Sequence, residues 1–388
     1  MPPQLNGADL PEPSADARLH SDRLSAVIRE EIRAAGGWIA FARFMELALY
    51  APGLGYYVAG ATKLGVDGDF VTAPEISSLF GRTLSRQIAQ LLETDSDEVL
   101  ELGAGSGVMA ADVLGELHAQ GRLPRRYLIL EPSPQLAQRQ RDTLRRKQPA
   151  LCDRVEWIAA LPENFNGVIV GNEVLDALPV HVVAWRKAGL FERGVGWQDG
   201  FIWVEQALPA GELRTVAESI AVAEGYVSEI SLTGPALVRS LAGTLRRGAL
   251  LLIDYGFGQR EFFHAQRSMG TLMSHYRHRA HENVFFLPGL QDLTAHVDFT
   301  AIAGAGIDAG LKLLGYTTQA HFLINCGITG LLEQPGEGNA VAQYASMAGA
   351  QKLLSPAEMG ELFKVIALGR GVDTSLLGFS SGDKSRLL

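Results

Sequence analysis

The chain contains a glycine-rich stretch whose spacing could hold a nucleotide-like ligand. Gly103, Gly105 and Gly107 alternate with small residues directly after an apolar run that is expected to form a strand. Glycines let the backbone turn tightly and approach a bulky ligand closely. The spacing differs from the G-x-G-x-x-G pattern that places a pyrophosphate at a helix N-terminus. By itself, the stretch would also fit an ordinary turn between a strand and a helix.

Two glutamates near this stretch narrow the choice of ligand. Glu101 lies two residues before Gly103, where a carboxylate would repel a dinucleotide and attract an α-amino or sulfonium group. Glu131 closes the next expected strand, where an acid can accept hydrogen bonds from both hydroxyls of a ribose. Both acids lie at carboxyl ends of strands, where such sheets bind ligands. Together they predict S-adenosylmethionine as the cofactor and methyl transfer as the reaction.

Acidic residues after a later strand could act on the reacting group. Glu173 and Asp176 are three residues apart, so they could share one face of a helical turn. We predict both as catalytic residues that orient a nucleophile, with Asn172 before them in the cofactor site. A second role for Asp176 stays open, because an acid at a helix N-terminus also satisfies free N–H groups.

The segment before the first expected strand of the sheet is too varied for a plain linker. Residues 68–75 read GDFVTAPE. As a hypothesis, this segment folds over the cofactor as a lid, with Thr72 near the methionine end and Glu75 near the methyl group as a third catalytic residue. The alternative is that Thr72, Pro74 and Glu75 only begin the following helix, since proline suits a first helical turn.

A polar cluster late in the chain is a candidate for substrate binding. Asp292, His296 and Asp298 alternate with other residues, so they would line one face of an extended segment, and His275 lies upstream. We interpret these four residues as a wall around the target side chain. The other two readings are a metal site and a structural hydrogen-bond network. We expect no metal, because the histidines lack a pattern of supporting groups.

An alternation of strands and helices is expected to position these groups. Strands are expected at 99–102, 127–130, 155–158, 168–170 and 249–253, separated by helices to about 119, over 134–147 and near 235–245. This order predicts an α/β fold, a Rossmann-like domain with a parallel, doubly wound sheet. The last strands are expected at 321–324 and 363–367.

Other segments are expected to add to this domain. We predict a disordered tail over 1–20, an N-terminal helical and lid region over 21–95, and the Rossmann-like domain over 96–388. Insertions are expected at about 180–233 and 256–299. The first should contain antiparallel strands between His181 and Ala207, with turns at Gly189 and Gly200.

Composition excludes several classes of protein. The formal net charge is −9, which disfavours binding to the phosphates of nucleic acids. No apolar run approaches the roughly 20 residues that span a bilayer, so membrane insertion is not expected. Only two cysteines occur, without metal-type spacing, which indicates a reducing compartment. We therefore expect a cytoplasmic location in a bacterium, or the mitochondrial matrix in a eukaryote.

The chain resembles the MidA-like family of class I S-adenosylmethionine-dependent methyltransferases, which includes the mitochondrial complex I assembly factor that methylates an arginine. The resemblance covers nearly the whole chain from about Ser21. It rests on eight stretches in the family order, which read FMELALYAPGLGYY, GDFVTAPEISSLFG, ELGAGSG, LEPSP, GNEVLDALPV, LLIDYG, LPGLQDLTAHVDF and MGELFKV. The glycine stretch departs from the family by carrying Ala104 and Ser106 where Pro and Arg are frequent. Both residues are small, so neither threatens cofactor binding.

The resemblance implies the fold and the cofactor, S-adenosylmethionine. We assign the cofactor site to Thr72, Glu101, Gly103, Ala104, Gly105, Gly107, Glu131, Pro132, Ser133 and Asn172. The resemblance also implies a protein arginine methyltransferase acting on a subunit of a respiratory NADH dehydrogenase. Since a guanidinium stays protonated, such a site needs carboxylates to orient it.

Two other functions stay open from the sequence. One is a small-molecule methyltransferase, and the other is a non-catalytic assembly or binding protein that retains the cofactor fold. The intact acids and glycines argue against the second of these. The oligomeric state is open as well, with a homodimer as one option.

Overall fold

The computed structural model describes residues 10–58, 72–93, 96–333 and 340–388. The chain divides into two compact units, each built from three separate segments. Unit 1 comprises Met1–Phe70, Leu175–Gly234 and Gln259–Asp298. Unit 2 comprises Val71–Val174, Pro235–Gly258 and Phe299–Leu388. Each unit is described by itself below.

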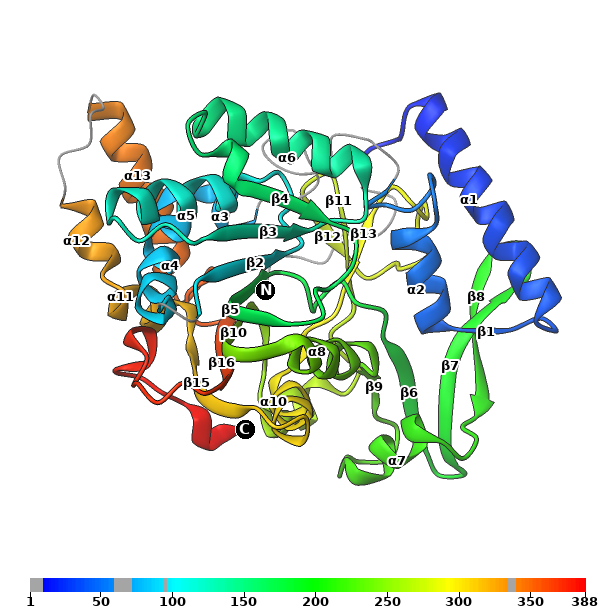
Figure 1. Ribbon diagram of the computed structural model, residues 1–388. Coiled ribbons are helices and arrows are strands. Elements are labelled where there is room, and N and C mark those ends of the chain that lie inside the picture. Colours follow the sequence, from blue (N-terminus) through cyan, green and yellow to red (C-terminus); the bar gives the residue numbers. More distant parts are fainter. Residues whose placement is uncertain (1–9, 59–71, 94–95, 334–339) are drawn as a thin grey trace. The chain divides into compact units, whose positions relative to one another are not determined.

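Unit 2 is built around a mostly parallel sheet with the strand order β15-β16-β10-β5-β2-β3-β4 (Figure 1). Five neighbouring strands, from β10 to β4, run parallel to one another, and β16 is antiparallel to both β10 and β15. The strands are β2 (Glu98–Leu102), β3 (Arg126–Leu130), β4 (Val155–Ile158), β5 (Phe165–Asn172), β10 (Leu245–Phe257), β15 (Lys312–Thr318) and β16 (Phe363–Arg370). This is the α/β class predicted from the alternation of elements.

The central strands are buried along their length, as expected for a parallel sheet covered on both faces. Val99, Ile129, Val170 and Leu251 join one apolar core with the helices that pack on their side. The helices of unit 2 are α3 (Ala73–Ile76), α4 (Ser78–Leu91), α5 (Val108–Ala119), α6 (Pro134–Lys147), α8 (Thr233–Thr244), α10 (Phe299–Asp308), α11 (Gln319–Asn325), α12 (Ile328–Leu332) and α13 (Ala340–Leu354).

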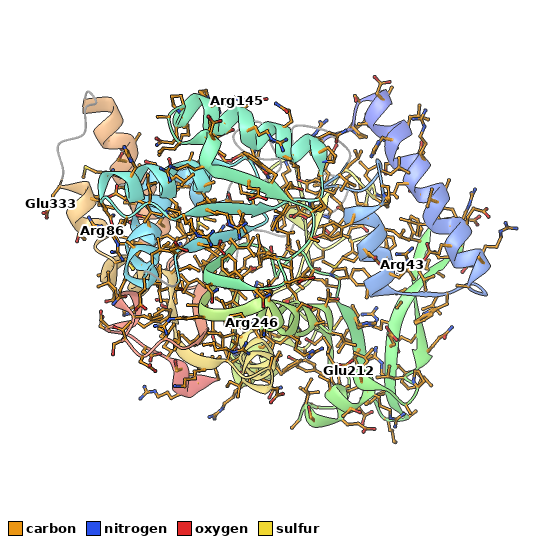
Figure 2. All side chains as sticks on the ribbon, viewed as in Figure 1. Arg43, Arg86, Arg145, Glu212, Arg246 and Glu333 are labelled. Carbon is orange, nitrogen blue, oxygen red and sulfur yellow. The ribbon has the colours of Figure 1, made fainter. Side chains whose placement is uncertain are left out.

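Polar side chains also tie the helices of unit 2 together. The guanidinium of Arg86 on α4, labelled in Figure 2, donates hydrogen bonds to the carbonyl oxygens of Cys326 and Gly327, at 3.2 and 3.0 Å. These carbonyls lie between α11 and α12, so Arg86 satisfies acceptors at a helix end. Cys326 is buried and, like Cys152, is a free thiol.

Unit 1 combines helices with two small antiparallel sheets. In the first sheet β7 pairs with β1, β6 and β8, and β6 pairs with β9; in the second, β11 pairs with β12 and β13. The strands of these sheets are β1 (Ile39–Ala40), β6 (His181–Arg186), β7 (Gly189–Trp197), β8 (Phe201–Ala207), β9 (Val227–Ile230), β11 (Met273–Tyr276), β12 (Arg279–His281) and β13 (Asp292–Thr294). A further short strand, β14 (Val297–Asp298), belongs to neither of them. The helices are α1 (Ala15–Ala34), α2 (Phe41–Tyr50), α7 (Glu212–Ser219) and α9 (Gln259–Phe262).

The core of unit 1 brings together residues from all three of its segments. Phe44 on α2, Val182 on β6 and Leu293 on β13 belong to one buried apolar cluster. The ring of Phe44 contacts the rings of Phe201 and Phe285, with centroids 5.3 Å apart in both cases. Within the described ranges, no helix is long and apolar enough to cross a membrane.

Two expectations about the elements were wrong. The helix expected from about Ser21 begins at Ala15, because the Ser14 side chain accepts a hydrogen bond from the Ala17 N–H and caps it, so residues 15–20 are not a tail. The strand expected at 321–324 is helix α11, which Thr318 caps, and the strand of this region is β15 at Lys312–Thr318. The segments expected as insertions at about 180–233 and 256–299 fall largely within Leu175–Gly234 and Gln259–Asp298 of unit 1.

Candidate functional site

The glycine stretch forms the turn between β2 and α5 in unit 2. Gly103, Gly105 and Gly107 have φ angles of 60°, 52° and 82°, in the left-handed region that side chains disfavour. A Cβ on Gly107 would also lie 3.0 Å from the Cα of Gln140 on α6. Both observations require glycine at this turn, so the loop has the backbone needed for close contact with a ligand.

Glu101 places a carboxylate inside the sheet at the beginning of this turn. The side chain is fully buried, and its Oε2 accepts a hydrogen bond of 2.5 Å from the Tyr127 hydroxyl. The other oxygen, Oε1, has no hydrogen-bond partner among the described residues. Burial raises the pKa of Glu101 to about 7, although the Tyr127 hydrogen bond lowers it. A buried acceptor without a donor fits the ammonium group of a methionine moiety.

Asn172 offers a second buried acceptor at the end of β5, the strand next to β2. Its Oδ1 has no partner in the described part of the chain, while its Nδ2 donates to Glu173 Oε1 at 2.9 Å. The amide orientation is thereby fixed with the oxygen left for another donor. Asn172 and Glu101 thus fit the polar end of the expected cofactor.

Glu131 lies at the end of β3, as the ribose-binding role requires. Its Oε1 accepts from the Ser133 N–H and its Oε2 from the Gln140 amide, both at 2.9 Å. Burial raises the pKa of Glu131, and these two hydrogen bonds lower it. Ser133 also caps α6 by accepting from the Leu136 N–H, whereas Pro132 beside it is exposed. The carboxylate is therefore held in one orientation, with lone pairs left for two hydroxyls.

Glu173 follows Asn172 in a strained backbone conformation. Its φ is 52°, and its N–H donates to the Ile253 carbonyl on β10 at 2.9 Å. The side-chain Oε1 accepts from Asn172 and from the N–H of Ala73, at 2.9 and 3.2 Å. A non-glycine residue in this region costs on the order of 1–3 kcal/mol, and such strain concentrates at functional sites.

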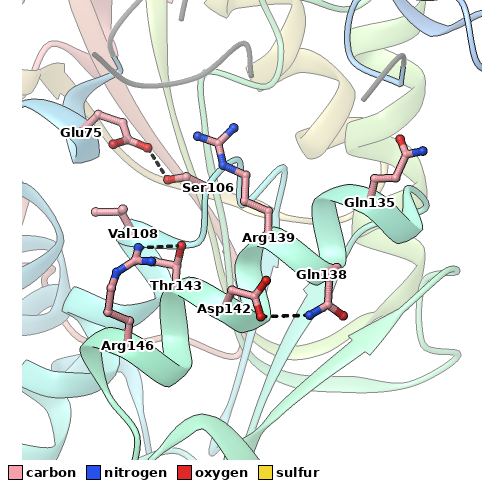
Figure 3. Close-up of a pocket in the computed structure, with 9 residues that line it drawn as sticks. All are labelled: Glu75, Ser106, Val108, Gln135, Gln138, Arg139, Asp142, Thr143 and Arg146. Atoms are coloured by element: carbon pink, nitrogen blue, oxygen red, sulfur yellow. Dashed lines mark hydrogen bonds between the residues drawn. The ribbon is translucent and has the colours of Figure 1, made fainter. Parts of the chain in front are cut away.

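The described part of the expected lid begins at Thr72, because residues 68–71 lie outside the described residues. Thr72 precedes α3, but its side chain makes no capping hydrogen bond, and Glu173 satisfies the Ala73 N–H instead. Glu75 accepts a hydrogen bond from the Ser106 hydroxyl of the glycine turn (Figure 3). The segment therefore contacts the glycine turn through Glu75 and the end of β5 through Ala73.

A cavity of about 540 Å³ lies beside the glycine turn (Figure 3). Its lining comes from α3, the glycine turn, α5 and α6, and consists of Glu75, Ser106, Val108, Gln135, Gln138, Arg139, Asp142, Thr143 and Arg146. Cationic and anionic side chains are mixed around it. Ala104, on the glycine turn, is buried.

The residues predicted to bind the substrate belong to unit 1, together with Asp176. Asp292 is 2% exposed, and its Oδ1 accepts from the Tyr57 hydroxyl at 2.9 Å and from the Leu293 N–H at 3.0 Å. His275 is the register partner of Asp292 in the β11–β13 pair. The Asp176 carbonyl accepts from the Ala295 N–H. These contacts bring Asp176, His275 and Asp292 to neighbouring positions in the unit.

The single extended segment expected from Asp292 to Asp298 is interrupted. Strand β13 ends at Thr294, and the His296 N–H donates to the Thr271 hydroxyl at 3.0 Å before β14 begins at Val297. The extended segment is therefore interrupted at His296, whose backbone N–H bonds to a side chain and not to a neighbouring strand. Among the described residues, no group of three or more His, Cys, Asp or Glu is arranged to hold a metal ion.

Two tyrosines of unit 1 were not predicted from the sequence. The rings of Tyr50 and Tyr57 stack with centroids 5.6 Å apart, and the Tyr50 hydroxyl donates to the Ala177 carbonyl at 3.0 Å. Burial raises the pKa of Tyr50, and the carboxylates of Asp292 and Asp176 raise it further. Both tyrosines lie in the stretch LALYAPGLGYY, whose aromatic residues were the available signal.

Unit 2 can therefore bind a ligand that has an ammonium group and a ribose. Carboxylates end β2 and β3, an amide ends β5, and glycines join them to α5. When S-adenosylmethionine is bound there, it supplies a methyl group on a sulfonium. The residues of the chain bind and orient the reactants and exclude water.

Comparisons with known proteins agree with this chemistry. Residues 80–317 match the model of a family described as "Putative S-adenosyl-L-methionine-dependent methyltransferase". The chain is 30% identical to "Protein arginine methyltransferase NDUFAF7, mitochondrial" of Mus musculus, over 86% of this chain and 81% of that protein. For the protein of the same name in Danio rerio, identity is 29%, over 86% of this chain and 84% of that protein.

The fold is also shared with a solved structure. A protein from Burkholderia thailandensis, crystallised with S-adenosyl-homocysteine bound, is 49% identical with a TM-score of 0.95, covering 98% of this chain and all of that chain. A native crystal structure from the same organism is 48% identical with a TM-score of 0.92. The chain therefore belongs to the S-adenosylmethionine-dependent methyltransferase family whose model spans residues 80–317, and S-adenosylmethionine is its cofactor.

Proposed function

We propose that this methyltransferase modifies arginine side chains of a protein partner. The observation that carries the proposal is the likeness to curated proteins named as protein arginine methyltransferases, which extends over 86% of this chain. Resemblance to the family of the complex I assembly factor leads us to propose a subunit of a NADH dehydrogenase as the partner.

Because the arginine side chain is a poor nucleophile, its methylation requires carboxylates in the active site. The guanidinium is protonated at working pH and its charge is delocalised, so carboxylates must orient it and concentrate electron density on one nitrogen. We assign this role to Glu173, with Asp176 and Glu75 as further catalytic residues. The strained backbone of Glu173 supports its assignment, since nothing in a plain strand end requires φ of 52°.

The remaining residues are assigned to binding. Thr72, Ala104, Pro132 and Ser133 are proposed to complete the cofactor site around the glutamates and glycines of unit 2. Asp292, His296, Asp298 and His275 of unit 1 are proposed to bind the partner's segment. Two free thiols support a reducing compartment, the bacterial cytoplasm or the mitochondrial matrix.

Labelling with a radioactive methyl donor tests the substrate. The purified protein is incubated with methyl-labelled S-adenosylmethionine and a lysate from a strain lacking the gene, and acid hydrolysates of labelled bands are analysed for methylarginine. We expect label on a protein band and methylarginine in its hydrolysate. Label confined to small molecules would support the small-molecule alternative and overturn the proposal. Bound S-adenosylhomocysteine without any transfer would support an assembly protein that retains the cofactor fold.

A matched pair of variants tests Glu173. Glu173→Gln keeps an oxygen for the Ala73 N–H and the Asn172 amide but removes the charge, so we expect at least about a 100-fold loss of kcat with S-adenosylhomocysteine affinity within about threefold. Glu163→Gln, at an exposed position of the same unit, is the control and should match the wild type. A Glu173→Gln variant with normal kcat would remove Glu173 from the mechanism.

A further inference from the structure

Gln140 on α6 is fully buried and contacts both Glu131 and the glycine turn. Its Nε2 donates to Glu131 Oε2 at 2.9 Å and to the Gly105 carbonyl at 3.2 Å. Its Oε1 accepts from the indole N–H of Trp157 on β4 at 2.8 Å. One amide group therefore links the ribose acid, the glycine turn and the neighbouring strand.

Each bond of this amide constrains a different part of the site. An amide has two N–H donors and one oxygen acceptor, and here both ends are used. The Trp157 N–H can only donate, so it fixes which end of the amide is oxygen and turns the NH₂ group toward Glu131 and Gly105. The backbone of Gln140 also packs against Gly107, where a Cβ would lie 3.0 Å from the Gln140 Cα.

We propose that Gln140, oriented by Trp157, is a positioning residue that sets the Glu131 carboxylate and the glycine turn in the geometry that binds the cofactor. The proposal goes beyond the methyl acceptor, because it concerns cofactor binding alone. Ser133 holds Glu131 Oε1 and Gln140 holds Oε2, so both oxygens are fixed before a ribose arrives. A site fixed in this way loses less entropy on binding.

The surroundings of Glu131 make its protonation a second readout. Burial raises the pKa of Glu131, and the bonds from Ser133 and Gln140 are the influences that lower it. The neighbouring cation on α6, Arg141, lies over the Trp157 ring with its guanidinium carbon 4.4 Å from the ring centroid. Removing the Gln140 amide therefore leaves Glu131 with a higher pKa, and protonated Glu131 accepts ribose hydroxyls less well.

Two variants of the full chain separate positioning from simple packing, using calorimetric titration with S-adenosylhomocysteine at pH 6 and pH 8. Gln140→Ala should weaken binding roughly tenfold at pH 8, and the ratio to the wild type should grow as the pH falls toward 6, because loss of the amide raises the pKa of Glu131. Gln140→Glu has nearly the same shape but sets a second carboxylate against Glu131. It should weaken binding by about 100-fold at pH 8, and the ratio should shrink at pH 6, where a protonated carboxyl again donates.

Trp157 provides an independent optical readout, since it is the single tryptophan of unit 2 among Trp38, Trp157, Trp185, Trp197 and Trp203. Saturating S-adenosylhomocysteine should change the tryptophan emission of the wild type, and this change should disappear in Trp157→Phe. In the Gln140→Ala variant saturated with S-adenosylhomocysteine, the change in tryptophan emission should be smaller. The reason is that the variant lacks the amide that bonds to both Glu131 and the Trp157 indole.

Gln120→Ala is the matched control, because Gln120 is exposed at the end of α5 and its side-chain amide donates to Glu116 of that helix. It should bind S-adenosylhomocysteine like the wild type at both pH values. Opposite pH trends for Gln140→Ala and Gln140→Glu support positioning. Equal losses at both pH values in the two variants would indicate packing alone and overturn the proposal, as would Gln140→Ala binding within twofold of the wild type.

Discussion

Glu101 is a carboxyl group that is fully buried in unit 2. Its unbound oxygen and full burial favour the neutral form, which is why its pKa rises from 4.5 to about 7. A carboxyl whose pKa is raised by folding contributes its full stability below the unfolded value, and this contribution is lost as the pH rises from about 4.5 through about 7. At neutral and basic pH, the buried charge of Glu101 therefore lowers the free energy of unfolding of the protein.

We predict that Glu101→Gln stabilises the cofactor-free protein at pH 8 and weakens cofactor binding. A glutamine oxygen still accepts from Tyr127, while the buried charge is removed, so the free energy of unfolding should rise by about 1–3 kcal/mol. Affinity for S-adenosylhomocysteine should fall roughly 10- to 100-fold, because the variant cannot make the charge-assisted bond that we propose between Glu101 and the ammonium group. Thermal melts and calorimetric titration measure the two effects.

The stability gain should also depend on pH. At pH 4, below both the unfolded value of 4.5 and the folded value of about 7, Glu101 is mostly neutral in both states, so the variant and the wild type should melt nearly alike. The exposed Glu163→Gln should change neither quantity. A Glu101→Gln variant that is less stable than the wild type at pH 8 would show that the carboxylate is satisfied in the free chain.

At the scale of elements, β5 and β10 approach each other closely at their N-terminal ends. Gly248 is the register partner of Gly167, and an ideal Cβ on either residue would collide with backbone. The neighbouring strand β2 contributes the carbonyl of Glu98 to the collision at Gly167. Glycine at these two positions allows the parallel strands to lie close together at their N-terminal ends. Glu101 and Asn172 lie at the opposite, C-terminal ends of their strands.

We predict that Gly248→Ala destabilises the protein by about 2–4 kcal/mol, because a methyl group must displace the Gly167 carbonyl. Gly243→Ala is the control in the adjoining helix α8, where nothing lies within 4 Å of the added Cβ. It should stabilise the protein by about 0.5–1 kcal/mol, since alanine favours helix. Urea unfolding compares the two, and similar effects of both changes would contradict the predicted collision.

Much of the unit 2 sheet could be predicted from local signals. Helix α6 and strand β4 have the bounds that the sequence predicted, because Ser133 and Pro134 mark a helix start and three of the four residues of Val155–Ile158 are apolar. Residues 321–324 were misread because a short apolar run does not distinguish a strand from a helix. The signal for a helix is the capping side chain of Thr318, which lies before residues 321–324.

In the candidate site, too, some residues could be predicted from local sequence signals and others could not. The positions of Glu101 and Glu131 at the carboxyl ends of β2 and β3 were predictable from the sequence, because both strands are short apolar runs near the glycines. Tyr57 and Gln140 were not, since their partners Asp292 and Glu131 are defined by folded contacts. For Tyr57, the partner is 235 residues away in the chain.

At the scale of the whole molecule, the chain passes between the two units five times, at 70/71, 174/175, 234/235, 258/259 and 298/299. Neither unit is a continuous piece of sequence. The assembly of unit 1 from three segments could not be read from the sequence, since its core depends on contacts among residues far apart in the chain. For the same reason, tests of either unit require the full chain.

We predict that the cofactor product protects one unit selectively from hydrogen exchange. S-Adenosylhomocysteine should slow amide exchange over 101–107 and 131–140, where the glycine turn, Glu131 and the start of α6 lie. Exchange in the antiparallel strands β6, β7 and β8 should stay unchanged. Mass spectrometry of peptides from the intact protein resolves these regions, and uniform protection of both units would contradict the prediction.

The position of β16 in the sheet has a consequence for biosynthesis. β16 covers β10 on the side away from β5, yet residues 363–370 follow the end of β10 at Phe257 by more than a hundred residues. At ribosomal rates of about 5–20 residues per second, this edge of a nascent sheet would stay unpaired for roughly 5–25 s. An open apolar strand edge is a template for aggregation. Nascent chains of this protein should therefore depend on chaperones until β16 has been made.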